Sequence, residues 1–191
     1  MTTRLPLSLV GALALLLAGT VSALVAGLVL GGGAEPLLLV DPGTTVRYGL
    51  PLATALVHLG AALAIGSLMV AAFALSSKDP GFEQSLVVAA LGAGLMTVAS
   101  GATAFLTFLA IYLEPVAVSA QFGDVLWLFA SETEIGRAWL ISIMLSAIVT
   151  VLALLIRSHT GVFLTGVVAV ASLWALAELG HAAVTANHEA A

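Results

Sequence analysis

The chain has 191 residues, of which 61% are hydrophobic and 8% are charged, and its formal net charge is −5. A soluble domain carries about 25% charged residues, so this sequence cannot cover itself with a polar surface and lipid must do so instead. The small, scattered charge disfavours a nucleic-acid partner, and the absence of cysteine excludes disulfides, thiolate metal sites and thiol nucleophiles. We therefore predict an all-α polytopic membrane bundle of about five transmembrane helices, forming a single domain over residues 1–191.

The first apolar run covers residues 5–30 and follows Arg4. Residues 21–23, Val-Ser-Ala, have the small-residue pattern of a signal-peptidase site. The apolar run nevertheless continues to Leu30, which is too long for a simple signal peptide. We predict an uncleaved first span.

Turn residues divide the rest of the chain into four more apolar stretches. Pro51 stands where the start of a helix tolerates proline. Ser131 and Glu134 have the spacing of a capping box, with the serine as the cap of the fourth span. The predicted spans after the first are 50–75, 86–113, 132–157 and 162–180.

Residues 119–129 contain an apolar, aromatic stretch that is too short to cross a bilayer, and we predict an interfacial helix there. In the third span, small residues recur every four positions and predict close helix packing. The positions in that row are Gly92, Met96, Ser100 and Ala104.

The basic residues near the span ends predict the orientation. Arg4, Lys78 and Arg157 fall on one side of the membrane, whereas Arg47 and Arg137 fall on the other, among most of the acidic residues. We predict that the N-terminus lies inside and the C-terminus outside.

Four polar side chains stand within or just beyond the outer ends of two spans: His58 in the second, and Glu178, His181 and His188 at the end of the fifth. Ionisable groups inside a membrane are functional-site candidates by default. Imidazole binds copper(II) and other borderline metals, and a nearby carboxylate such as Glu178 can orient an imidazole through its second nitrogen. The simpler alternatives are a histidine that bonds a neighbouring helix and solvated residues at a helix end.

Three methionines, Met69, Met96 and Met144, are candidates for a deeper path of soft ligands, because copper(I) accepts thioether sulfur. Methionine more commonly fills a core. His159, in a tight turn, is interpreted as a solvated loop residue.

Several segments resemble one family. They are 41–51 (DPGTTVRYGLP), 57–66 (VHLGAALAIG), 133–140 (TEIGRAWL) and 180–188 (GHAAVTANH). In order and spacing they are similar to actinobacterial membrane proteins that join a copper-resistance-D-like half to a cytochrome c oxidase assembly half. The chain departs from the family in lacking the tryptophan that often follows the histidine of the second span.

The resemblance implies copper handling in the bacterial plasma membrane, by copper uptake or by delivery toward oxidase assembly. It implies His58, His181 and His188 as metal ligands, with Glu178 orienting an imidazole. Family members continue past the equivalent of Ala191. This chain is then a fragment, the ordered part of a longer protein, or a shortened relative.

Two alternatives remain open. A structural or accessory subunit of a larger membrane complex, such as a respiratory one, would use the small-residue rows to meet other subunits or a missing C-terminal half. A haem-b cytochrome needs paired axial histidines on neighbouring helices, and only His58 is securely inside a span. We expect no enzymatic activity, because no nucleophile stands beside a base at a recognisable spacing.

Overall fold

The computed structural model describes residues 7–32, 35–36, 41–112 and 119–185, with side chains as far as Leu173. Over these residues every regular element is an α-helix. The helices are α1 (Leu7–Leu30), α2 (Thr44–Phe73), α3 (Pro80–Ile111), α4 (Ala120–Glu132), α5 (Glu134–Leu155) and α6 (His159–Thr185).

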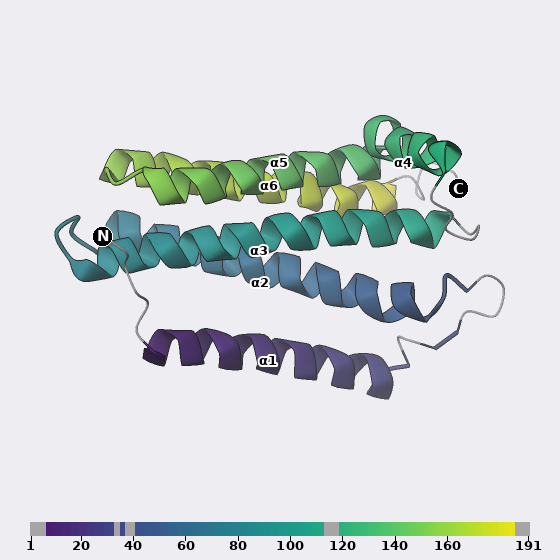
Figure 1. Cartoon of the computed structure of the whole chain (residues 1–191), viewed down its shortest axis with the longest axis horizontal. Helices are drawn as coiled ribbons and strands as arrows, with labels where there is room; N and C mark the ends of the chain where they lie inside the picture. The colour runs from purple at the N-terminus through teal and green to yellow at the C-terminus, as the bar shows by residue number, and fades with distance from the viewer. Residues whose placement is uncertain (1–6, 33–34, 37–40, 113–118, 186–191) are drawn as a thin grey trace.

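Four of these helices, α2, α3, α5 and α6, pack side by side into one bundle (Figure 1). The most extensive contacts join α2 to α3 and α3 to α5. The short α4 packs on α5 at one end of the bundle, whereas α1 lies beside α2 and has no buried residue.

Long apolar helices confirm the predicted polytopic all-α fold. In the described part of the chain, α1, α2, α3 and α5 are each long and apolar enough to cross a membrane. The helix α6 extends over 27 residues, and its stretch His159–Leu173 is apolar. Their outward-facing side chains are largely apolar, as expected for surfaces against lipid.

The predicted packing row on α3 lies at the contact with α2. Gly92 and Met96 are buried, and Gly60 of α2 lies directly against them. A Cβ atom added at Gly60 would stand 2.7 Å from the Gly92 carbonyl oxygen. The two backbones therefore approach as closely as small residues allow, in the manner of membrane helix pairs.

The start of α2 differs from the sequence-based expectation. The helix begins at Thr44, so Pro51 lies inside it and the prediction that Pro51 marks its start is wrong. Gly43 is the N-cap, and Asp41 orders the turn before it, because its carboxylate accepts the Gly43 N–H at 3.0 Å and pairs with Arg47 at 3.4 Å. Gly43 turns the chain with a φ of 89°, a conformation that glycine adopts readily.

The corner between α4 and α5 also corrects a prediction. The cap of α5 is Thr133 rather than Ser131, because the Thr133 hydroxyl accepts the Gly136 N–H at 2.9 Å. Ser131 belongs to the last turn of α4 and donates to the Trp127 carbonyl oxygen. The fourth long helix thus begins two residues later than predicted, and α4 covers the segment that we expected to lie in the interface.

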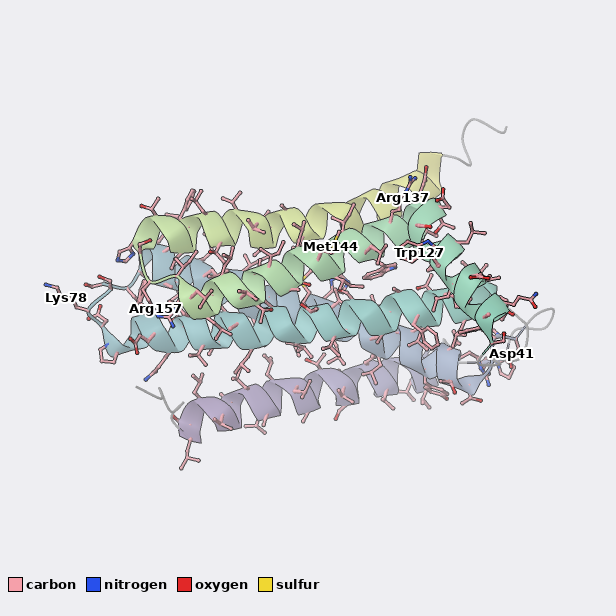
Figure 2. All side chains as sticks on the ribbon, turned by 45° about the horizontal axis from the view of Figure 1, so that its top comes forward. Asp41, Lys78, Trp127, Arg137, Met144 and Arg157 are labelled. Carbon is pink, nitrogen blue, oxygen red and sulfur yellow. The ribbon has the colours of Figure 1, made fainter. Side chains whose placement is uncertain are left out.

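The two ends of the bundle carry different charged groups. Lys78 and Arg157 lie at the end formed by the α2–α3 and α5–α6 loops, and Asp41, Trp127 and Arg137 lie at the opposite end (Figure 2). This separation matches the sequence-based grouping of the basic residues. Which end faces the cytoplasm remains a prediction.

Candidate functional site

His58 lies halfway along α2, as the fifteenth residue of a helix of 30 residues. This is deeper than the expected position about two turns from the helix start, because α2 begins earlier than predicted. The side chain is exposed, whereas its neighbour Val57 and the residue one turn on, Ala61, are buried. His58 therefore stands on an outer face of the bundle and not in its core.

The other candidate ligands belong to the far end of α6. The backbone of Glu178 and His181 is helical, but their side chains lie outside the described part of the structure. His188 lies outside the described residues altogether. His159 begins α6 at the opposite end of the bundle, where its exposed ring meets Phe82 edge-on at 5.2 Å between centroids.

The packing of α2 against α6 sets their register. A Cβ at Gly166 would contact the Cβ of Leu68 at 4.0 Å, and Ala61 and Ser172 line one small internal space. The two helices therefore run antiparallel, and position 58 is level with about residues 175–177 of α6 at 1.5 Å per residue. Position 181 is then only roughly 7 Å further along the axis.

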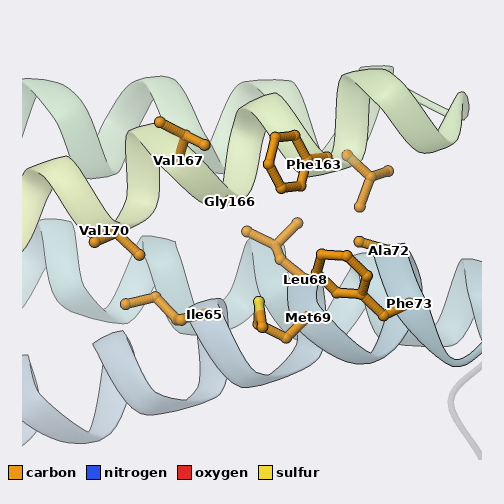
Figure 3. A pocket seen from close by; sticks show the side chains of 10 residues that line it. Ile65, Leu68, Met69, Ala72, Phe73, Phe163, Gly166, Val167 and Val170 are labelled. Carbon is orange, nitrogen blue, oxygen red and sulfur yellow. The ribbon is translucent and has the colours of Figure 1, made fainter.

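A groove between the same two helices shows which faces meet there. It has a volume of about 260 Å³ and an apolar lining (Figure 3). The walls are Ile65, Leu68, Met69, Ala72 and Phe73 of α2, with Val162, Phe163, Gly166, Val167 and Val170 of α6.

The helical repeat connects this groove to the histidine positions. On α2, His58 precedes Ile65 and Met69 by about two and three turns, so the three share one row. On α6, position 181 follows Phe163 by about five full turns and falls on the row that forms the facing wall. These two rows define the seam between α2 and α6. The seam continues from the groove along both helices to positions 58 and 181.

All four predicted site residues lie within one matched region. The family model described as "Copper resistance protein D-like, N-terminal domain" matches residues 42–188. This chain belongs to that family. The match covers α2 to α6 of the CopD-like chain and leaves out α1, and it suggests a membrane function related to copper. No curated protein and no solved structure matches the chain significantly.

The core of the CopD-like bundle contains polar contacts that sequence reasoning missed. The Thr97 hydroxyl of α3 donates to the Ser146 hydroxyl of α5 at 2.9 Å, and the Ser100 and Ser142 hydroxyls lie 3.4 Å apart. The Thr97 and Ser146 hydroxyls also lie within bonding distance of a carbonyl oxygen in the preceding turn of their own helices, that of Ala93 for Thr97 and that of Ser142 for Ser146. The small size of Ser100 predicted close packing. That its hydroxyl lies near the Ser142 hydroxyl follows from how α3 and α5 are rotated about their axes, which the sequence does not specify.

Replacement of Ser146 by alanine is expected to lower the free energy of unfolding by about 1 kcal/mol, the usual value of one bond between membrane helices. The measurement is chemical unfolding in detergent micelles. Thr165→Val is the control, because it keeps the volume of the buried side chain and removes a hydroxyl that, among the described residues, bonds the Gly161 carbonyl oxygen of its own helix. An equal loss in both variants would contradict a role for the contact between α3 and α5.

The three methionines differ in their exposure. Met96 is 2% exposed and its sulfur accepts the Ser172 hydroxyl at 3.8 Å. Met69 and Met144 are 53% and 56% exposed, on different helices, and Met144 faces outward on α5 (Figure 2). Of the three, only Met96 lies in the core, and the deeper path of soft ligands stays a prediction.

Acidic and imidazole groups do not gather in the part of the structure with described side chains. No three His, Asp or Glu side chains there are close enough to hold a metal ion. The proposed ligand set consists of one described side chain, His58, and three that lie beyond this part. Its assembly remains a prediction.

Proposed function

We propose that the CopD-like chain handles copper in the bacterial plasma membrane, by uptake or by delivery toward oxidase assembly. Membership of the copper resistance protein D-like family carries the proposal. The antiparallel register of α2 and α6 supports it, because positions 58 and 181 fall on facing rows at similar depths.

The proposed ligands are the imidazoles of His58, His181 and His188, with Glu178 orienting one ring through its second nitrogen. Neutral imidazole suits copper(II) and retains affinity for copper(I). It also costs less in a lipid environment than a charged ligand would. Copper is the cargo in this proposal, so the chain binds and passes the ion and performs no catalysis.

Copper retention by the purified full chain tests the proposal. The native chain is expected to keep about one copper per molecule after desalting. The double variant His58→Ala with His181→Ala is expected to lose it, since loss of a group that only orients a ligand already costs about 10–100-fold in metal affinity. His159→Ala is the matched control, because that histidine lies at the other end of the bundle. Unchanged retention in the double variant, or equal loss in the control, would count decisively against this site.

The helix α1 favours a second candidate function, that of an accessory subunit in a larger membrane complex. None of its residues is buried, and it lies outside the matched family region. Apart from its contact with α2, the surface of this helix is available to a neighbouring subunit. Copurification of oxidase subunits with the native chain, lost when residues 1–30 are deleted while copper retention is unaffected, would favour this role.

A further inference from the structure

The apolar groove between α2 and α6 is open on its outer side and lies in the part of the bundle that lipid surrounds. Its two rims include the exposed side chains of Met69 and Phe73 on α2 and of Phe163 on α6. The rings of Phe73 and Phe163 meet edge-on at 6.0 Å and mark its end toward the α2–α3 and α5–α6 loops. An opening of this kind in a hydrocarbon medium admits apolar groups only.

The dimensions of the groove distinguish between apolar occupants. Its volume of about 260 Å³ is slightly below the range of about 300–1,000 Å³ found for small-molecule pockets. A helix with its side chains is about 10–12 Å across and does not fit such a space. One flexible hydrocarbon chain does, because it can enter lengthwise between the two helices.

Cationic groups lie at the same end of the bundle. Lys78 is exposed five residues after Phe73, and Arg157 is exposed five residues before Val162 (Figure 2). The Arg157 Nη1 donates to the carbonyl oxygens of Ala153 and Ile156, which holds the guanidinium at the end of α5. Basic residues at the level of the lipid headgroups bind anionic phospholipids.

We propose that the groove holds one acyl chain of an anionic phospholipid, whose headgroup lies at the end of the bundle that contains Lys78 and Arg157 and is attracted by their positive charges. The apolar walls would recognise the chain, and the two cations would select the headgroup. This inference does not depend on the copper function. The bound lipid would lie on the same face of α2 as His58.

Native mass spectrometry of the full chain tests the proposal. The chain is equilibrated in detergent with phosphatidylglycerol or with phosphatidylcholine of the same acyl chains. We expect one phosphatidylglycerol to be retained, and phosphatidylcholine to be retained less. Gly166→Leu should lower retention of both lipids by about tenfold or more, because its side chain fills the groove and excludes several methylene groups. The Cβ itself needs no backbone movement, since its nearest neighbour is at 4.0 Å.

Charge variants separate the headgroup from the chain. Lys78→Gln with Arg157→Gln should reduce phosphatidylglycerol retention to that of phosphatidylcholine. The matched controls, Arg137→Gln at the other end of the bundle and Gly101→Leu on an open part of α3, should leave retention unchanged. Inorganic phosphate added in excess should not displace the lipid, which distinguishes a lipid site from a free-phosphate site.

Three outcomes would overturn the inference: no lipid retained by the native chain, full retention by Gly166→Leu, or a second copy of the chain bound in place of lipid. Val167→Trp replaces Gly166→Leu if the latter does not fold, because Val167 is 52% exposed on the groove wall and a larger ring there also closes it.

Discussion

Gly92→Leu is expected to lower the free energy of unfolding by about 3 kcal/mol or more, the upper end of the cost of overpacking. A Cβ at this position would lie 2.7 Å from the Ala64 nitrogen and 2.8 Å from the Gly60 carbonyl oxygen. Both are backbone atoms of α2, so no side-chain rotation can relieve the contact. The two helices would have to separate along the most extensive contact in the bundle.

Unfolding in detergent micelles, followed by circular dichroism, measures this loss. Gly101→Leu is the matched control on the same helix, because a Cβ there meets nothing within 4 Å, and its effect should be below about 1 kcal/mol. Similar losses in the two variants would show that the cost comes from leucine in α3 in general and not from the contact of Gly92 with α2.

The apolar runs predicted the helices well because the requirement for hydrogen-bonded backbone in lipid leaves few alternatives. Their ends were less predictable. Pro51 suggested a helix start, but the Asp41 carboxylate and the left-handed Gly43 begin α2 before it. Such a turn depends on local side-chain and backbone geometry that a hydropathy pattern does not contain.

The depth of His58 follows from the same detail. An earlier start moves the residue to the middle of α2, and the buried positions around it show that it faces outward. The direction in which a side chain points, into the bundle or toward lipid, depends on which neighbouring helices its helix packs against. In a helix that is apolar all round, the sequence holds little information on that choice.

The polar core shows the same limit. Ser100 was expected to pack closely because it is small, but its approach to Ser142 depends on how α3 and α5 rotate against each other. The histidine ligands were implied by the family resemblance. Hydrophobic periodicity carries no information about them. The structure adds the register of α2 and α6 that relates position 58 to position 181.

The register of α2 against α6 places the proposed copper site and the proposed lipid site along the same seam of the bundle. The groove occupies the part near Lys78 and Arg157, and the His58 row continues toward the opposite end. Binding of an acyl chain between α2 and α6 would hold these helices at a fixed separation. The distance between the proposed ligands depends on that separation.

Gly136→Val is expected to detach α4 from α5 and to lower the free energy of unfolding by about 2–3 kcal/mol. Gly136 is buried at the first turn of α5, and a Cβ there would overlap the Phe129 carbonyl oxygen. That oxygen already accepts the Thr133 hydroxyl at 2.6 Å and the Thr133 N–H at 3.3 Å, so it cannot move without breaking the corner.

Hydrogen–deuterium exchange provides the local measurement. In Gly136→Val, amides of residues 120–132 should exchange at least about tenfold faster, because the aromatic contacts that Phe122 and Phe129 make with Phe108 would be lost with the corner. Gly123→Val on α4 is the control, since a Cβ at Gly123 meets nothing within 4 Å. If exchange in α4 stays slow in Gly136→Val, then the aromatic contacts hold α4 in place and the corner at Gly136 does not.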